Sequence, residues 1–522
     1  MYLLKAPVAF LAGMVVLSLA GCGGSVKYIP TPPPPAVVVP STLPFVLFST
    51  RSDSTVDAAV NTDIVAVFSE PLDPASVTAA AVTVKGDDSA LVTGTVSYDA
   101  ARNAIVFKQA ADLGAQRYTA TIAPTVKDAA GNAMAQAYSW KFTVNAARRD
   151  TTVQKSLQQV LDKAAYSFQI PGAIMAVRDN AGNTWTTTNG YADVSNRTPM
   201  TSNLQIRIGS NTKPFVATMI LQLADEGKIA LDAPIKTYIN EEFLYYMPAY
   251  YNKPNVVTVR HLLNHTSGFA NFTTDPGWNS AYLSEPLKTY AVGDLLRLAN
   301  GQVAVPGAPV FNNFAYSNTN YVLLGLIIRN ASGETYEQAL SRRILLPQGL
   351  RETRAPLIGD ATVPAPFTRG YWEDPDTRIL KDVTQRDSST VWASGNITTT
   401  ITDLARWGEM LGRGTLVSGA MQNQRLQYKT MSASLDYGLG IVKDKGANMI
   451  GHQGGIIGYS SQVYYLPDTG YTVAFMYNRT LNLHDYSLVM TYDALDVLFP
   501  GRQNKPIAAA FMSNLRKDFT EY

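Results

Sequence analysis

The chain has 522 residues, 46% of them hydrophobic, which is enough for two or three domains with sizeable cores. Lys and Arg number 43 against 41 Asp and Glu, a net charge of +2, and no basic block is long enough to follow a phosphate backbone, so nucleic acid is excluded as an expected partner. Cys22 is the single cysteine, which excludes an intrachain disulfide and a cysteine-based zinc site.

Residues 1–21 have the layout of a secretory signal peptide, with one early positive charge at Lys5 and an apolar run of about a dozen residues, shorter than a bilayer requires. The run ends in Leu19-Ala20-Gly21-Cys22, which resembles a bacterial lipobox. The resemblance implies that Cys22 is lipidated and tethers the chain to a membrane, and Gly23 after it implies the outer membrane, facing the periplasm or the cell surface. A plain secretory signal that happens to contain a cysteine is the alternative.

Residues 22–44 are rich in proline and predict an extended, semi-rigid tether. Residues 45–146 contain short alternating segments separated by Asp, Gly, Asn and Pro clusters, which predict an all-β sandwich. The segments are 64–68, 82–84, 94–98, 104–107, 118–122 and 139–144. Residues 68–74 and 127–132 resemble bacterial Ig-like repeats of surface proteins. A spacer role is favoured over binding of a glycan or partner, because no aromatic patch or ligand cluster is evident.

Residues 151–500 differ from the short alternating segments before them, because strand patterns occur at both ends of this stretch and helical periods occur between them. This order predicts an α/β domain, a sheet flanked by helices, as the catalytic body. The tail at 501–522 shows little apolar periodicity and is assigned no role.

Ser210-Asn211-Thr212-Lys213 is the only Ser-x-x-Lys in the chain, and it opens a run apolar on nearly every side that predicts a buried central helix. Pro214 fits the first turn of that helix and Gly227 its C-terminal cap. Residues three apart share a helix face, so Lys213 can place its amine beside the Ser210 hydroxyl. A serine needs such a base, and burial can favour the neutral amine that serves as one.

Two further segments carry candidate site residues. Tyr316-Ser317-Asn318 precedes a second buried helix and is predicted to point a phenol and an amide into a cleft, although Tyr-x-Asn also occurs at 238–240 and 250–252. His452-Gln453-Gly454-Gly455 is predicted to lie in a glycine-rich turn region between strands, where backbone N–H groups can hold an oxyanion.

In this order the three motifs resemble the penicillin-recognising serine hydrolases, close to D-alanyl-D-alanine carboxypeptidases and class C β-lactamases. Segments 231–234, 257–268 and 393–397 resemble further signatures of that family. The resemblance implies an antiparallel β-lactamase-like sheet with a helical subdomain. It also implies that Ser210 is the acylated nucleophile, Lys213 its base and Tyr316 a proton shuttle to the leaving group. Asn318 is implied to hydrogen-bond the substrate amide or Lys213, and the remaining substrate-binding residues are His452, Gly454 and Gly455, with an oxyanion hole at the N–H groups of Ser210 and Gly455. No metal or cofactor is implied.

His452 stands where many β-lactamases have lysine, a departure that the peptidase and esterase branches share. An imidazole is only partly charged near pH 7 and anchors a carboxylate less firmly, so substrates without one remain open. His261 and His265 are assigned structural roles, because Leu262 replaces the glutamate of a zinc peptidase and no third ligand is evident. No Gly-x-Ser-x-Gly nucleophile elbow occurs.

The sequence therefore predicts a membrane-anchored serine hydrolase, with D-alanyl peptides of the cell wall as the first expected substrates. Esterase, D-amino-acid amidase or β-lactamase activity on small esters, amides or β-lactams is the alternative with the same catalytic residues. A surface-binding lipoprotein with an inert hydrolase body is the alternative from another class.

Overall fold

The computed structural model describes residues 43–50, 55–239, 241, 245–248, 256–301, 312–374, 379–480 and 486–502. The predicted signal peptide, Cys22, nearly all of the tether and most of the tail lie outside the described residues. Within the described part of the chain, no helix is both long and apolar enough to cross a membrane.

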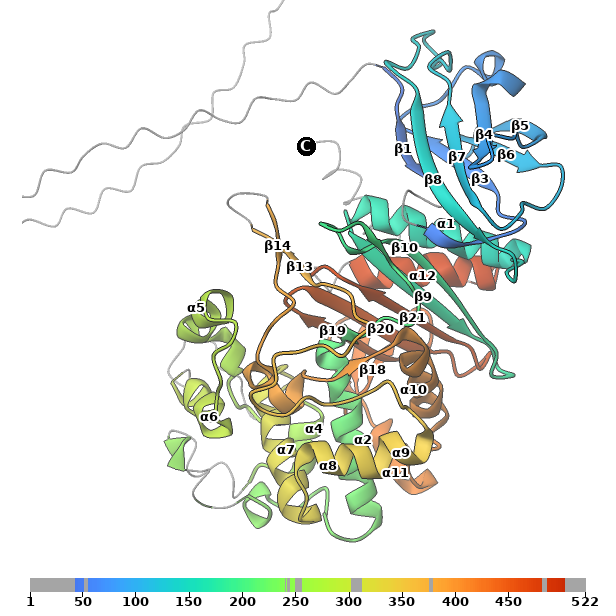
Figure 1. Cartoon of the computed structure of the whole chain (residues 1–522). Helices are drawn as coiled ribbons and strands as arrows, with labels where there is room; N and C mark the ends of the chain where they lie inside the picture. The colour runs from blue at the N-terminus through green and yellow to red at the C-terminus, as the bar shows by residue number, and fades with distance from the viewer. Residues whose placement is uncertain are drawn as a thin grey trace, which may run out of the picture. The chain divides into compact units, whose positions relative to one another are not determined.

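The N-terminal domain is a sandwich of two four-stranded sheets (Figure 1), as predicted. All six predicted segments are strands, and two more, β1 and β2, precede them. Alternate residues of strands such as β4 are buried in a core that contains Trp140 and Phe142. One sheet has the order β1 (Val46–Ser49), β3 (Ile64–Phe68), β6 (Ala104–Gln109), β5 (Gly94–Asp99), and the other β2 (Thr55–Ala59), β8 (Tyr138–Asn145), β7 (Arg117–Ile122), β4 (Val82–Gly86).

The second domain is built on a nine-stranded sheet in which every paired neighbour is antiparallel. Strand β9 shows why both faces of this sheet are covered: Ile174 and Ala176 belong to one core, and Ala173, Met175 and Val177 to another. The order is β11 (Thr198–Pro199), β10 (Thr184–Asp193), β9 (Gly172–Arg178), β21 (Thr472–Tyr477), β20 (Tyr459–Tyr465), β19 (Met449–Ile456), β18 (Val442–Asp444), β17 (Leu435–Tyr437), β16 (Lys429–Thr430).

Helices cover the two faces of the sheet (Figure 1). On one side α1 (Thr152–Ser167) packs with α12 (Tyr486–Leu498), and on the other α10 (Ile401–Arg413) lies against the central strands. The remaining α-helices of the described residues are α2 (Thr212–Asp225), α4 (Val259–Leu263), α5 (Pro276–Ser284), α6 (Val292–Asn300), α7 (Asn318–Ser332), α8 (Tyr336–Leu340), α9 (Leu346–Gln348) and α11 (Gly419–Arg425). Two short antiparallel pairs, β12 (Ile206–Arg207) with β15 (Thr398–Thr399) and β13 (Tyr371–Glu373) with β14 (Leu380–Asp382), complete the described strands.

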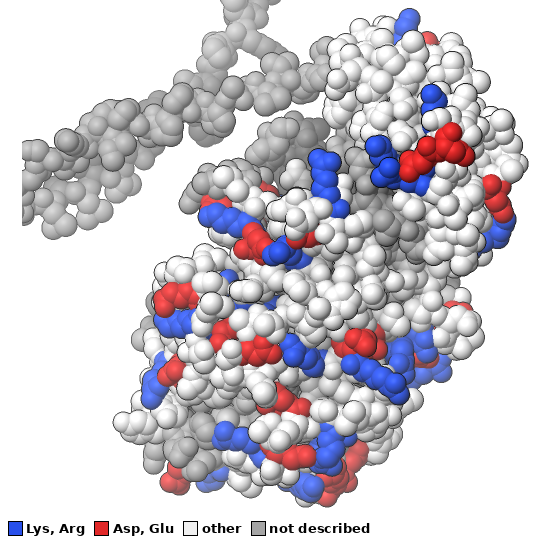
Figure 2. All heavy atoms as spheres, in the orientation of Figure 1, with Lys and Arg blue, Asp and Glu red and all other residues white. Residues whose placement is uncertain are grey.

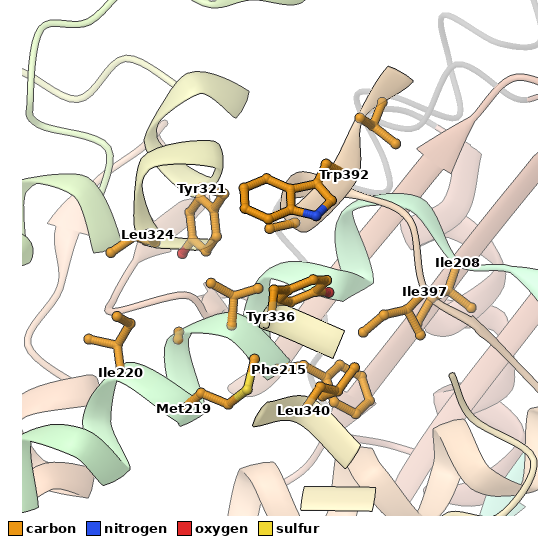
Figure 3. Packing of buried hydrophobic residues seen from close by; sticks show 14 of the residues in the cluster. Ile208, Phe215, Met219, Ile220, Tyr321, Leu324, Tyr336, Leu340, Trp392 and Ile397 are labelled. Carbon is orange, nitrogen blue, oxygen red and sulfur yellow. The ribbon is translucent and has the colours of Figure 1, made fainter. Parts of the chain in front are cut away.

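Helix α2 is the buried centre that its apolar sequence predicted. Pro214 lies in its first turn, and Gly227 has a φ of 71°, the left-handed cap expected there. Phe215 stacks on Trp407 of α10 with ring centroids 3.6 Å apart, and Figure 3 shows Met219 and Ile220 in the cluster that contains Tyr321 of α7. The start of α2 is therefore held in place from several sides.

The glycine-rich segment near 451–455 differs from the prediction of a turn region, because it lies within strand β19 and the turn follows at Ile457 and Gly458. On the face drawn in Figure 2, the coloured basic and acidic side chains are interspersed, and neither sign forms an extended patch among the described residues visible there.

Candidate active site

Ser210 lies in a 3₁₀ turn, η3 (Gly209–Asn211), that leads directly into α2. This turn packs closely on β19, since a Cβ on Gly209 would lie 2.6 Å from the carbonyl oxygen of Gly455, and one on Gly454 would lie 1.8 Å from that of Ile208. Gly209 also has a φ of 51°. Glycine is required at these positions because any side chain would push the serine turn away from the strand.

Lys213 is fully buried, and its Nζ lies 3.0 Å from Ser210 Oγ. The same nitrogen donates to Asn318 Oδ1 at 2.7 Å and to the carbonyl oxygen of Ser394 at 2.8 Å. Both of these oxygens can only accept, so a neutral amine uses its two N–H groups on them and turns its lone pair to the Ser210 hydroxyl. Burial lowers the pKa of Lys213 well below its usual value, which favours this neutral form.

Tyr316 lies on the loop just before α7, and the centre of its ring is 4.9 Å from Lys213 Nζ. Burial raises the pKa of the Tyr316 phenol above its usual value, and a hydrogen bond with Ser210 offsets part of this rise. The phenol therefore keeps its proton at neutral pH. A protonated phenol and a neutral amine on one serine hydroxyl form an acid and a base in the arrangement that acyl transfer requires.

Asn318 is the first residue of α7, and its amide is oriented by contacts on both sides. Its backbone N–H donates to Asn271 Oδ1 at 3.1 Å, and its Nδ2 donates to Thr273 Oγ1 at 3.3 Å. These bonds leave Oδ1 directed to Lys213. Asn318 therefore contacts the lysine and also lines the cleft described below.

His452 differs from its prediction in charge, because the expected partly charged imidazole is neutral. It is 3% exposed, its Nδ1 faces the carbonyl oxygen of Gln453, and its Nε2 lies 3.0 Å from the Tyr437 hydroxyl. A carbonyl only accepts, so Nδ1 carries the proton and Nε2 accepts from the phenol. Burial lowers the pKa of His452 to about 3. The imidazole is therefore neutral, and its role at neutral pH is not to provide charge.

A cleft of about 510 Å³ opens beside Ser210. Its described lining contains no charged side chain, and aromatic and aliphatic groups make up much of the wall. His452 and Gly454 do not belong to the lining, whereas Gly455 does. The lining residues are Ser210, Thr273, Trp278, Asn279, Tyr282, Leu283, Asn318, Trp372, Val391, Ser394, Gly395, Gly455, Ile456, Ile457 and Thr480.

Sequence reasoning did not assign the aromatic wall. Trp278 and Tyr282 lie one turn apart on α5 and stack with ring centroids 4.4 Å apart. Trp278 Nε1 donates to the carbonyl oxygen of Thr390 at 3.2 Å, and the Tyr282 hydroxyl accepts from the N–H of Ile457 at 3.1 Å. Their spacing is that of any helix face, so nothing in the sequence connects them with Ser210.

The described residues contain no group of three or more His, Cys, Asp or Glu side chains that could hold a metal ion. His261 and His265, which the sequence analysis assigned structural roles, are not part of such a group.

This fold, with a serine–lysine–tyrosine cluster at the start of a buried helix, defines a serine hydrolase of the penicillin-binding type. The family model described as Beta-lactamase matches residues 151–496, and the chain belongs to that family. The model described as Bacterial Ig-like domain matches residues 40–144. The predicted fold class and family resemblance are thus confirmed.

The chain is also similar to individual proteins. It is 26% identical over 342 residues to penicillin-binding protein 4* of Bacillus subtilis, covering 62% of this chain and 72% of the relative. A D-stereospecific amidohydrolase from Streptomyces sp. is 28% identical with a TM-score of 0.57, covering 66% of this chain and 98% of that structure. The D-amino acid amidase of Ochrobactrum anthropi SV3 shares the fold, with a TM-score of 0.57, 24% identity, and coverage of 70% and 100%.

Proposed function

We propose that the protein hydrolyses small amides, peptides or esters through an acyl-enzyme on Ser210. The observation that carries this proposal is the set of three partners around Lys213 Nζ: two carbonyl oxygens and, at 3.0 Å, Ser210 Oγ. Such a neutral, oriented amine is the base that a serine nucleophile needs.

In the proposed reaction Ser210 Oγ attacks the substrate carbonyl carbon while its proton passes to Lys213 Nζ. The N–H groups of Ser210 and Gly455 stabilise the oxyanion. Tyr316 gives its phenolic proton to the leaving nitrogen or oxygen and recovers the proton held by Lys213. The bond to the leaving group breaks, and the acyl group remains on Ser210. Water then attacks the ester, the acid leaves, and Ser210 regains its proton.

D-Alanyl peptides are the substrates expected from the sequence, and similarity to penicillin-binding protein 4* supports them. Small D-amino-acid amides and esters are the second candidate, which similarity to the D-stereospecific amidohydrolase supports. One observation favours the second: the described cleft lining carries no charge and His452 is neutral, so neither provides a cation for a terminal carboxylate. We therefore rank uncharged amides and esters above carboxypeptidase substrates.

Covalent labelling tests the mechanism. Fluorescent penicillin or an activated ester should label the wild-type protein, with the label mapped to the peptide that contains Ser210, and Ser210→Ala should take up none. Ser432→Ala, which changes an exposed serine, serves as the matched control and should label like the wild type. Equal labelling of Ser210→Ala would place the nucleophile at another residue, and no burst with any acyl donor would favour the surface-binding lipoprotein.

A substrate panel separates the candidates. A D-alanyl-D-alanine peptide, the same peptide with its C-terminal carboxylate amidated, a D-alanine amide and an aryl ester should be hydrolysed at different rates. The amidated peptide should exceed the free acid in kcat/KM by about 10-fold or more, because a carboxylate that enters the uncharged cleft loses its hydration and finds no charge-assisted contact, worth roughly 1.5–3 kcal/mol, to replace it. A preference for the free acid would restore the carboxypeptidase interpretation.

We also propose that lipid on Cys22 anchors the protein at the bacterial envelope, most simply the outer membrane, and that the Ig-like domain acts as a spacer. The basis is the lipobox-like Leu19-Ala20-Gly21-Cys22 with the proline-rich stretch after it. Fatty-acid labelling of the full chain in a bacterial host should be lost in Cys22→Ala. Cleavage without lipid attachment would instead indicate an ordinary secretory signal.

A further inference from the structure

His265 lies directly behind the Tyr316 loop and contacts it at three points. Its backbone oxygen accepts the N–H of Ala315 at 2.8 Å, and its Nδ1 accepts the N–H of Ser317 at 3.2 Å, so both neighbours of Tyr316 are bound to this one residue. The His265 and Tyr316 ring centroids are 4.3 Å apart. The backbone and the ring of Tyr316 are thus fixed from the same side.

The hydrogen bonds of His265 also define its protonation. Ser317 N–H can only donate, so Nδ1 must accept. Asn320 Nδ2 lies 3.1 Å from the same nitrogen, and its orientation is set because Asn320 Oδ1 accepts the Ser267 hydroxyl at 2.6 Å. Because two donors face Nδ1, the proton of the neutral ring is on Nε2. An imidazolium would also carry a proton on Nδ1, and that N–H would be repelled by the two donor groups that face it.

The surroundings disfavour a charged ring as well. His265 is fully buried, and the Tyr321 and Tyr437 ring centroids lie 5.2 and 4.8 Å from its own. Its Nε2 has no hydrogen-bond partner among the described residues. Burial lowers the pKa of His265 well below its usual value.

We infer that His265 is a positioning residue for the acyl-transfer reaction: as the neutral Nε2–H tautomer, it holds Tyr316 in the orientation in which the phenol meets Ser210 Oγ. The inference rests on the proposed function of Ser210, Lys213 and Tyr316. His265 acts through Tyr316 and is not among the described residues that line the cleft. Its backbone adopts a φ of 59°, an uncommon value that histidine and asparagine accept more readily than most residues, so the position constrains both backbone and side chain.

Two amide substitutions separate the role of Nδ1 from that of bulk. In His265→Asn the side-chain oxygen can occupy the Nδ1 position, accept from Ser317 N–H, and tolerate the positive φ. In His265→Gln the amide reaches the Nε2 position and leaves Ser317 N–H without its acceptor. The matched control is His261→Asn, which changes a half-buried histidine four residues earlier that does not line the described cleft. The Nδ1 of His261 accepts the N–H of Thr258 at a distance of 3.0 Å.

The experiment measures single-turnover acylation by an aryl ester, together with KM and thermal unfolding, for the full chain. We expect His265→Asn and His261→Asn to stay within about 3-fold of the wild-type rate. His265→Gln should be slowed by about 100-fold with little change in KM, because a displacement near 1 Å of a catalytic group has that effect. The Gln variant should lose most of this penalty in a Tyr316→Phe background, since both changes act on the same group.

Wild-type acylation rates in folded His265→Gln would overturn the inference. It would also be overturned if His265→Gln lowered the acylation rate by the same factor in the wild-type and the Tyr316→Phe backgrounds. If His265→Gln does not fold, the Asn variant still decides, because a rate far below that of His261→Asn contradicts rescue through the Nδ1 position. Failure of the proposed function is distinguishable, since it appears as undiminished acylation in Ser210→Ala, whatever the His265 variants do.

Discussion

The packing of the serine turn on strand β19 provides a quantitative test at Gly454. A Cβ there would lie 1.8 Å from Ile208 O and 2.9 Å from Asn211 N, whereas Cβ contacts under 3.0 Å are essentially never found. In Gly454→Ala the turn and the strand must therefore separate by at least ~1.2 Å. Ile208 O also accepts the Ser461 hydroxyl at 2.8 Å and the Asn211 N–H at 3.2 Å, so this shift moves the turn that holds Ser210.

A displacement of that size at a nucleophile lowers the rate by about 100-fold. Overpacking should also reduce the free energy of unfolding by about 1–3 kcal/mol, which a domain of ordinary stability survives. Stopped-flow acylation by an aryl ester measures the first effect, and urea denaturation the second.

Gly419→Ala is the matched control, because a Cβ at this helix start meets nothing within 4 Å. It should leave both acylation and unfolding close to wild type. If folded Gly454→Ala acylates within about 3-fold of the wild type, the close approach of β19 does not position Ser210.

Three further outcomes are expected. Lys213→Met should abolish acylation. The buried amine loses its proton on folding, so the free energy of unfolding of the wild type should rise with pH between the lowered pKa of the folded state and the pKa of the unfolded state. The rise should exceed that of the variant by up to about 1.4 kcal/mol per pH unit. Urea titrations from pH 7 to 10 that give equal slopes for the two proteins would contradict this expectation. Tyr282→Phe removes the acceptor of Ile457 N–H at the cleft wall and should raise KM by about 10-fold with kcat nearly unchanged in steady-state assays; an unaltered KM would show that this bond does not shape the cleft. Trp407→Ala removes the ring stacked on Phe215 and should lower the free energy of unfolding, measured in urea, by about 3–5 kcal/mol. Trp372 is only half-buried, so Trp372→Ala should have a much smaller effect. Similar losses in the two variants would argue against a core anchored on α2.

The local chemistry of the site was predictable from the sequence, because it depends on short spacings. Ser210 and Lys213 share a helix face at three residues, and an apolar run of helical length predicts that this helix is buried, which in turn predicts a neutral amine. Tyr316 could be selected among three Tyr-x-Asn matches only by the apolar helix after it. Each of these inferences uses a period or a flank within about twenty residues.

Groups that meet through the fold were not predictable in this way. The Ser394 carbonyl that orients Lys213, the aromatic wall at Trp278 and Tyr282, and the contact of His265 with the Tyr316 loop each join segments distant in sequence. The environment of His452 was misjudged for the same reason, because burial and its two hydrogen bonds, not residue type, determine its charge. The glycines of β19 resembled a turn in the sequence, yet they are needed in a strand because another backbone lies against them. The sequence determines which chemical groups are available and which of them share a face of one helix. Burial, protonation and the shape of the cleft depend on the tertiary structure, because distant segments must pack together before they exclude water from the site.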